Sequence, residues 1–503
     1  MSGGIHMRVD MKTKLIGRKE EQTLLDLAYK SDKPEFLALH GRRRVGKTFL
    51  IRCHFEEKKE SIFFNATGME DGTTAEQISN FTEEIGEAFL YPGARLGVKK
   101  NWRDTFSVLT DTIKATPTHK KIVLFFDEFP WMVAKRSRLL QVLEYYWNHH
   151  WSKDPRIKLI ICGSASGWIL KNIINNKGGL YNRVTRTLCL EPFDLKKTKQ
   201  YLNYSNIKLN HKQIASLYMV LGGIPFYLSQ IDPGLSAHQI IEKLAFRKDS
   251  FLLKEFDSLY ATLFGTEGVY VELVRTMAQY RYGIGQEELA NKIQQLSSGG
   301  RIVSRLEELE QAGFIARFKP FSHKKKGIYY KVIDEYTLFY FNWIEPIKES
   351  LLSKGMRKGY WQSLQDSSTW HTWTGYAFEA LCYKHLVQIS AALELNPTAI
   401  PYTWRHIPKN DSQKSGAQID LLFDRNDGVI TLCEIKNTSQ PFVIDKQYAE
   451  KLKKKMEAFR EITRTKKQLF LAMISAAGLK KTMYSEEMIS QIVSLDDLFR
   501  EVL

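Results

Sequence analysis

Short runs of consecutive apolar residues alternate with helix-like stretches over the first part of the chain. Three such runs are FLALH (Phe36–His40), KIVLFFDE (Lys121–Glu128) and IKLIICGS (Ile157–Ser164). A short run without polar alternation is typical of a strand that is buried on both faces. Because helical stretches separate the runs, we expect a parallel sheet covered by helices from about Leu15 to Asp194. The pattern from Leu195 to about Lys248 is helical.

The apolar pattern changes between residues 268 and 333. Three short amphipathic helices are expected there, followed by a strand, the basic turn SHKKKG and a second strand. This order of elements is typical of a winged helix-turn-helix. The aromatic stretch Asp334–Pro346 is expected to be a connector helix, and the polar, mixed residues 350–370 are expected to be a linker.

Two further apolar runs lie in an α/β block that extends from about His371 to the C-terminus. They belong to GAQIDLLFDRNDGVITLCEIKNTSQ (Gly416–Gln440), where the polar turn DRNDG joins them into an expected antiparallel hairpin. Asp420 and Glu434 are 434 − 420 = 14 residues apart, so their carboxylates should converge across the two strands. Lys436 should share a strand face with Glu434, because the two are two positions apart.

Hydrolysis of a phosphodiester is the chemistry that these three side chains favour. Two carboxylates are oxygen ligands suited to Mg²⁺ or Mn²⁺. A nearby lysine can orient or activate water and stabilise the charge that develops on the phosphate. The alternative is a surface hairpin that carries a Glu–Lys pair.

A phosphate-binding motif follows the first apolar run. GRRRVGKT matches G-x-x-x-x-G-K-[ST], and a helix-like run comes next, which is the context that the motif requires. The loop consists of Gly41, Arg42, Arg43, Arg44, Val45, Gly46, Lys47 and Thr48. Its backbone N–H groups and the start of the helix favour phosphate oxygens. We expect Lys47 to reach the β- and γ-phosphates of ATP and the Thr48 hydroxyl to ligate Mg²⁺.

The second and third apolar runs end in polar residues. Asp127 and Glu128 close one run and Ser164 closes the other. Since ligands bind at the carboxyl ends of parallel strands, we expect Asp127 to hold Mg²⁺, mainly through water. Glu128 is expected to orient the attacking water or act as a general base, and Ser164 to sense the γ-phosphate. The alternative is a pair of solvated acids after a strand.

The charge of the chain favours a polyanionic partner. Lys and Arg number 73 against 56 Asp and Glu, a formal net charge of +17, which suggests nucleic acid or nucleotide. For the nuclease interpretation, DNA is expected more than RNA. Solvated charged faces are the alternative. Five scattered cysteines without a CxxC pair argue against a disulfide framework or a zinc site. No run approaches the roughly 20 apolar residues of a membrane span, and the first residues lack a secretory signal, so we expect a cytoplasmic protein.

Residues 15–345 resemble the archaeal-type ATPases of the AAA+/STAND group. Besides the phosphate loop and the acidic strand, the resemblance rests on LIGRKEEQTLL, LYNRVTRTLCLEPF and LGGIPFYL. It implies that Gly17 and Pro225 lie near the adenine. It also implies that Arg183 or Arg186 neutralises charge at the γ-phosphate, within the subunit or across an interface of a homo-oligomer. The alternative for these two arginines is packing against acids.

The C-terminal block resembles the PD-(D/E)XK nuclease superfamily. The match is I-D, 13 residues, then E-I-K, although Ile419 stands where the motif has proline. The resemblance implies a metal shell of Glu379, Asp420 and Glu434, with Lys436 as a catalytic partner. Glu379 belongs to the helix-like stretch TGYAFEALCYKHLV ahead of the hairpin.

A second basic surface is expected in the winged helix-turn-helix. Arg301 and Arg305 lie four apart on its third helix, opposite the apolar residues Ile302, Leu306 and Leu309, and the turn adds three lysines. This arrangement would suit a DNA groove and its phosphates. The alternative is an internal lid or docking module.

Together these expectations describe an ATP-hydrolysing switch coupled to a metal-dependent nuclease that acts on DNA, with genome defence or mobile elements as its setting. The alternative is a nucleotide-switched signalling scaffold whose last domain binds nucleic acid or a partner without cleavage. The expected fold class is α/β throughout. The expected domains are a tail (1–14), a P-loop ATPase core (15–194), a helical lid (195–267), a winged helix with connector (268–349), a linker (350–370) and a nuclease-like domain (371–503).

Overall fold

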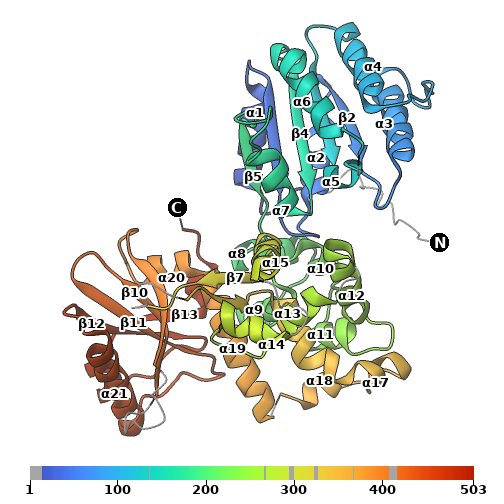
Figure 1. Cartoon of the computed structure of the whole chain (residues 1–503). Coiled ribbons are helices and arrows are strands. Elements are labelled where there is room, and N and C mark those ends of the chain that lie inside the picture. Colours follow the sequence, from blue (N-terminus) through green and yellow to red (C-terminus); the bar gives the residue numbers. More distant parts are fainter. Residues whose placement is uncertain are drawn as a thin grey trace. The chain divides into compact units, whose positions relative to one another are not determined.

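The computed structural model divides the chain into two compact units, Met1–Pro192 and Phe193–Leu503 (Figure 1). It describes residues 14–134, 136–265, 268–293, 299–321, 327–365, 367–406 and 416–502. Most of the expected basic turn SHKKKG and the side chain of Arg301 lie outside the described residues. No helix in the described ranges is long and apolar enough to cross a membrane.

A five-stranded parallel sheet forms the centre of the first unit. Its strand order is β2-β3-β4-β1-β5, and helices separate most of the strands along the chain, which confirms the expected parallel α/β fold. The strands are β1 (Glu35–His40), β2 (Ser61–Thr67), β3 (Lys121–Asp127), β4 (Ile157–Gly163) and β5 (Arg186–Cys189). The helices are α1 (Lys19–Lys30), α2 (Lys47–Phe55), α3 (Thr74–Phe89), α4 (Trp102–Ala115), α5 (Phe129–Met132), α6 (Leu139–His149) and α7 (Ser166–Ile169), with short turns of helix at Trp151–Lys153 and Leu170–Ile174.

The two outer strands of this sheet are not among the expected ones. Residues 61–67 fall within a stretch expected to be helical, but they form β2, and residues 186–189 form β5. Both strands lie at an edge of the sheet and are only partly buried. An edge strand needs no long apolar run, so the pattern that identifies the central strands does not identify these two.

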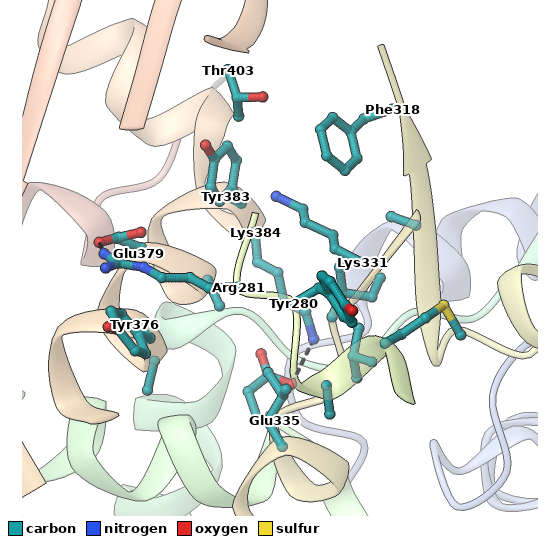
Figure 2. A pocket seen from close by; sticks show the side chains of 18 of the residues that line it. Tyr280, Arg281, Phe318, Lys331, Glu335, Tyr376, Glu379, Tyr383, Lys384 and Thr403 are labelled. Atoms are coloured by element: carbon teal, nitrogen blue, oxygen red, sulfur yellow. Dashed lines mark hydrogen bonds and ion pairs between the residues drawn. The ribbon is translucent and has the colours of Figure 1, made fainter. Parts of the chain in front are cut away.

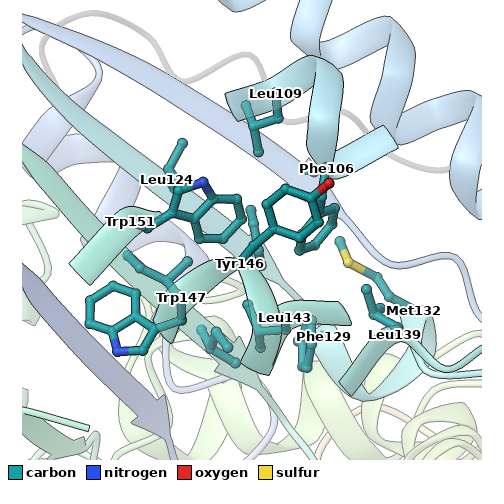
Figure 3. Packing of buried hydrophobic residues seen from close by; sticks show 14 of the residues in the cluster. Phe106, Leu109, Leu124, Phe129, Met132, Leu139, Leu143, Tyr146, Trp147 and Trp151 are labelled. Atoms are coloured by element: carbon teal, nitrogen blue, oxygen red, sulfur yellow. The ribbon is translucent and has the colours of Figure 1, made fainter. Parts of the chain in front are cut away.

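An aromatic core lies on the face of the sheet that α3, α4 and α6 cover (Figure 3). The ring of Phe106 stacks on that of Trp151 at 5.2 Å between centroids and meets Tyr146 edge-on at 5.7 Å. The indole N–H of Trp151 donates to the Thr110 hydroxyl at 3.1 Å. This packing fixes β3 and β4 against the helices and so fixes the ends of those strands.

The second unit begins with helices, in agreement with the expected pattern. These are α8 (Leu195–Tyr204), α9 (His211–Leu221), α10 (Pro225–Leu228), α11 (Ala237–Ala245) and α12 (Phe251–Phe264). The next segment contains α13 (Val269–Ala278), β6 (Ile284–Gly285), α14 (Gln286–Lys292), α15 (Gly299–Gln311), β7 (Ile315–Phe318) and β8 (Tyr329–Val332). Its strands form an antiparallel sheet in the order β6-β8-β7. Three helices and two strands were expected here in this order, and β6 is additional.

Residues 350–370, expected to be a polar linker, contain helices and a buried tryptophan. The connecting segment contains α16 (Glu335–Phe339), helical turns at Tyr340–Ile344 and Glu345–Ile347, α17 (Lys348–Ser353) and α18 (Tyr360–Ser363). Trp361 is fully buried, stacked on Phe246 at 5.0 Å and edge-on to Trp343 at 5.1 Å. The Glu242 carboxylate accepts hydrogen bonds from the backbone N–H groups of Gly359 and Trp361. A polar average hides the large apolar surface of a tryptophan, which is why the sequence pattern gives no sign of this packing.

The chain ends in a mixed five-stranded sheet of order β13-β12-β11-β10-β9. Strands β9, β10 and β11 are antiparallel, whereas β11, β12 and β13 are parallel. The elements are α19 (Ser368–Lys384), α20 (Leu386–Ala392), β9 (Ile400–His406), β10 (Ala417–Asp424), β11 (Val429–Lys436), α21 (Lys446–Thr463), β12 (Gln468–Ser475), α22 (Met483–Met488), β13 (Ile489–Ser494) and a final turn at Leu495–Phe499. The expected hairpin is β10–β11, and β9 and β13 are additional edge strands.

Candidate functional site

The loop after β1 curls around its own lysine. Lys47 begins α2, and its ammonium donates to the backbone carbonyls of Gly41 at 2.9 Å and Arg42 at 3.0 Å. Gly41 has φ +145°, and a Cβ there would lie 2.4 Å from the carbonyl oxygen of Leu190. Gly46 has φ +91° and precedes the helix. Both conformations favour glycine, so the two motif glycines are needed for this curvature.

Two side chains that sequence analysis did not single out support the loop. Arg18 is buried, donates to the carbonyl of Val45 at 3.1 Å and pairs with Glu21 at 2.9 Å. The Ser166 hydroxyl accepts from the Gly41 N–H at 3.1 Å. The only signal for Arg18 is its place directly after Gly17 with an acid three positions later. Of the expected loop residues, Arg42 and Val45 are buried, and Arg43 and Arg44 are half-buried.

The ends of β3 and β4 bring the expected polar residues together beside the loop. The Thr48 hydroxyl donates to Asp127 Oδ2 at 2.6 Å. Glu128, with φ +42°, accepts hydrogen bonds from the Ser164 hydroxyl at 2.7 Å and from the Ser164 backbone N–H at 3.0 Å. Burial, and then the neighbouring Glu128, raise the pKa of Asp127. A hydroxyl and a buried carboxylate in contact fit Mg²⁺, because a cation would compensate the buried negative charge.

The two arginines expected near the γ-phosphate have different surroundings. Arg183 is exposed in the turn before β5. Arg186 lies in β5 opposite Leu37 and forms an ion pair with Glu35 at 3.3 Å. Glu35 begins β1, so Arg186 points to the end of the sheet opposite the loop, and packing against an acid describes it. Pro225 is the first residue of α10 in the second unit.

The hairpin of the second unit brings its three expected residues together. Leu421 lies opposite Cys433, so Asp420 and Glu434 are the next facing pair. The Lys436 ammonium lies 2.8 Å from Glu434 Oε1. These residues line a cavity of about 520 Å³. Its walls include Arg281, Tyr282, Glu379, Arg405, His406, Gln418, Asp420, Glu434, Lys436 and Lys455.

Glu434 is buried but ionised. Helix α21 supplies Lys455, whose ammonium lies 2.8 Å from Glu434 Oε2, and Tyr448, whose hydroxyl donates to Oε1 at 2.6 Å. Burial raises the pKa of Glu434, but Lys455 and Lys436 outweigh this effect and lower it to about 2. No spacing in the sequence connects α21 to β11, so Lys455 and Tyr448 were not foreseen.

Asp420 is in the opposite electrostatic situation. Its carboxylate accepts from the Gln418 amide at 2.8 Å and from the Ile435 N–H at 3.4 Å. Burial and then the charge of Glu434 raise its pKa. The hairpin thus holds one strongly ionised carboxylate beside one whose ionisation is suppressed.

Glu379 pairs with a cation from another part of the second unit. Arg281, in the turn between α13 and β6, forms an ion pair with Glu379, and its guanidinium lies 3.5 Å from the centroid of the Tyr376 ring. Burial and then Asp420 raise the pKa of Glu379 to about 7. Across the described residues, no three His, Cys, Asp or Glu side chains are grouped to hold a metal ion. The hairpin therefore offers two carboxylates, which fit a Mg²⁺ that takes its other ligands from water and phosphate.

Comparisons with known proteins identify the part of the chain that contains the phosphate loop. The model of a family described as an ATPase domain predominantly from Archaea matches residues 15–231. An uncharacterized protein of Methanocaldococcus jannaschii is 25% identical over 425 residues, which are 84% of this chain and 87% of the relative. An uncharacterized ATP-binding protein of the same organism is 46% identical over 44 residues, 9% of this chain and 75% of the relative.

Solved structures resemble the chain at low identity. A Walker-type ATPase of Pyrococcus abyssi has 20% identity and a TM-score of 0.46, covering 65% of this chain and 96% of the other. The ORC2 protein of Aeropyrum pernix, in its ADPNP–ADP complexes, has 12% identity and a TM-score of 0.40, covering 67% of this chain and 94% of the other. From the family match and the P-loop described above, residues 15–231 are an ATPase domain of the archaeal type.

Proposed function

We propose that the first unit binds Mg²⁺–ATP and hydrolyses it to switch the state of the chain. The observation that carries this proposal is the contact between Thr48 and Asp127, with Glu128 and Ser164 beside it. Lys47 would exchange its bonds to the loop carbonyls for phosphate oxygens. Mg²⁺, held by Thr48 and Asp127, would neutralise charge on the phosphates.

Glu128 is the residue that we propose acts on the attacking water. Its carboxylate is held by Ser164, so its direction is fixed before ATP binds. In that position it would orient the attacking water, and Ser164 would report the presence of the γ-phosphate through this bond. We propose Gly17 as a neighbour of the adenine. Arg183, which is exposed, is the better candidate for the γ-phosphate than Arg186.

Release of phosphate and binding of a fluorescent ATP analogue test the ATPase site. Lys47→Ala should lose both, whereas Glu128→Gln should keep binding and lose turnover at least about a hundredfold. Lys171→Ala, an exposed lysine of the same unit, is the matched control and should behave as the parent. Turnover that persists in Lys47→Ala would refute the assignment.

We further propose that the second unit cleaves DNA with a divalent metal at the hairpin. The supporting observation is that Asp420, Glu434 and Lys436 converge in one cavity with the additional cations Arg405 and Lys455. Cations at the wall would attract the phosphate backbone, and Lys436 would orient water or stabilise charge on the phosphate. Plasmid DNA with Mg²⁺ or Mn²⁺, with and without ATP, should be nicked or linearised.

The matched variants for this assay lie close together in sequence. Glu434→Gln and Lys436→Met should abolish cleavage, and Glu450→Gln, exposed on α21, should leave it unchanged. ATP should alter the rate if the two units are coupled, and Lys47→Ala should remove that effect. Cleavage by Glu434→Gln at the parent rate would place any nuclease activity elsewhere.

A second candidate is a switch whose last domain binds nucleic acid or a partner without cutting. It is favoured by the ion pair that occupies Glu379, since the described residues then offer only two carboxylates at the hairpin. Binding of DNA without cleavage under any metal or nucleotide condition would support this candidate over the nuclease.

We also propose that residues 268–333 are a winged helix-turn-helix. The order α13, α14, α15, β7, β8 supports it, and so does the burial of Ile302, Leu306 and Leu309 on one face of α15. Arg305 lies on the other side, 5.7 Å from the centroid of the Tyr270 ring. If this module docks on DNA, Arg305→Gln should weaken binding of a duplex in a mobility-shift assay. Unchanged binding would favour a lid or docking role.

A further inference from the structure

A second cavity lies within the second unit, beside the one at the hairpin. It measures about 680 Å³, and its walls come from the end of α13, β7, β8, α16, α19 and β9. Figure 2 shows the rings of Tyr280, Phe318 and Tyr383 around it. It shares Arg281 and Glu379 with the hairpin cavity, so the two are adjacent. Volumes of roughly 300–1,000 Å³ are typical of sites for small organic ligands.

The acids of this cavity are already matched by cations. Glu335 is almost fully buried, and its Oε2 lies 2.6 Å from the ammonium of Lys384 (Figure 2). The carboxylate of Glu379 pairs with Arg281. Each of these two carboxylates therefore has a partner of opposite charge within the wall of the cavity.

Lys331 is an excess cation in the same wall. Its side chain extends from β8 into the space between Tyr383 and Phe318 (Figure 2), and its ammonium lies 3.3 Å from the centroid of the Tyr383 ring. Over the described ranges, no carboxylate lies within ion-pairing distance of this ammonium. Glu379 acts on it only at longer range. Lys331 is partly buried, and a partly desolvated ammonium without a counter-charge is unfavourable, so an anionic group that completes the site is the simplest reason to keep it.

The walls around Lys331 are aromatic as well as cationic. Phe318 and Tyr280 present rings to the cavity, and the apolar residues Met277 and Ala316 lie beside them. Planar rings suit stacking against a flat aromatic group, which is how proteins hold nucleobases without reading their sequence. A cation beside aromatic walls therefore matches a ligand that joins an anion to a planar ring.

We propose that this cavity binds a nucleotide, with its phosphate on the ammonium of Lys331 and its base against the rings of Tyr280 and Phe318. The nucleotide is either a free mononucleotide or an unpaired nucleotide of a nucleic-acid strand. Both sources present the same phosphate and base to the cavity. The site is distinct from the P-loop and does not require that the hairpin cleaves DNA.

Binding experiments should use the full chain with Lys47→Ala, so that the P-loop contributes no signal. The probes are dAMP, deoxyadenosine without the phosphate, and a fluorescein-labelled single-stranded oligothymidine, with calorimetry for the first two and anisotropy for the third. Introducing Lys331→Met should weaken binding at least about tenfold for whichever of the two phosphate-bearing probes, dAMP or the oligothymidine, binds the parent, because a charge-assisted contact is lost. Deoxyadenosine should bind weakly and equally to both proteins.

The matched control is Lys254→Met, which removes an exposed lysine of the same unit that pairs with Asp249. It should bind every probe as the Lys47→Ala parent does, and melting temperatures should show that all three proteins are folded. Binding of dAMP that depends on Lys331 identifies a free-nucleotide site, and binding of the oligonucleotide alone identifies a strand site. The proposal is overturned if no probe binds saturably, or if Lys331→Met binds as tightly as its parent.

Discussion

Replacing Lys331 with methionine should make the second unit more stable. The lysine stem packs in the cavity wall, and methionine keeps much of that apolar volume. What the change removes is an ammonium that has no carboxylate partner within the described residues. A substitution that stabilises a protein while it removes binding is the expected sign of a residue kept for function.

The expected gain can be estimated from the electrostatics of the site. Burial lowers the pKa of Lys331 from 10.5 to about 8. At about 1.4 kcal/mol for each pKa unit, the charged form costs about 3 kcal/mol at neutral pH. The contact with the Tyr383 ring returns up to about 2 kcal/mol. Lys331→Met should therefore raise the free energy of unfolding by about 1–3 kcal/mol at pH 7.

The gain should depend on pH in one direction. The folded pKa of Lys331 lies below the unfolded value, so between about pH 8 and pH 10.5 the unfolded state binds more protons than the folded state. The parent therefore gains stability as the pH rises through this window. The variant, which lacks the amine, does not. Its advantage should be complete below pH 8 and should vanish by about pH 10.5. Glu379 and Tyr383 of α19 face the same ammonium and remain in both proteins.

Urea unfolding of the parent and of Lys331→Met at pH 7 and pH 9.5, followed by tryptophan fluorescence, measures the difference directly. Lys254→Met reports the effect of losing an exposed lysine of the same unit, which should be within about 0.5 kcal/mol of zero. If Lys331→Met is no more stable than the parent at pH 7, the ammonium is not an uncompensated charge in the cavity wall, and the reasoning fails.

The remaining predictions concern the hairpin cavity, the ion pair beside it and the segment that contains Trp361. Lys455→Met should cost the second unit about 2 kcal/mol in urea unfolding because Glu434 loses a charged partner, whereas Lys453→Met, an exposed neighbour on α21, should cost under about 0.5 kcal/mol. Trp361→Ala should cost about 3–5 kcal/mol in the same assay, and a loss under about 1 kcal/mol would mean that the segment is a linker after all. Arg281→Gln should free the carboxylate of Glu379 and so tighten the binding of Mn²⁺ measured by calorimetry. An unchanged affinity would show that the ion pair between Arg281 and Glu379 does not restrict the site.

The central elements of both units are predictable from apolar pattern alone. Strands β1, β3 and β4 are continuous apolar runs because they lie inside a parallel sheet and are buried on both faces. The β10–β11 hairpin is equally clear, since a polar turn separates two such runs. The edge strands β2, β5, β9 and β13 bury less surface and carry no comparable signal. The packing of residues 350–370 is hidden from the pattern for a related reason. One large buried side chain, Trp361, can anchor a segment whose average composition is polar.

The candidate sites divide in a similar way. Spacing within one strand or loop places Thr48, Asp127 and Glu434, since the motif or the hairpin register fixes them. Partners that come from a distant element cannot be read from spacing. Arg18 beneath the loop and Lys455 on Glu434 are of this kind, and each contacts its partner only because two elements pack together.

The net charge of +17 does not by itself say where an anion binds, because an exposed lysine is compatible with almost any function. The surroundings of each lysine are more informative than the total charge. Lys436 and Lys455 both pair with Glu434, and Lys384 pairs with Glu335, so each of these lysines contacts an acid in the same wall. Lys331 has no such match in the described part of the chain, and its lowered pKa predicts a cost in stability. A charge that is retained against a cost in folding points to a ligand more strongly than many charges that cost nothing. The positive surplus of the sequence is therefore most informative at this one partly buried lysine in a cavity wall, and the nucleotide that it would hold is the partner to test first.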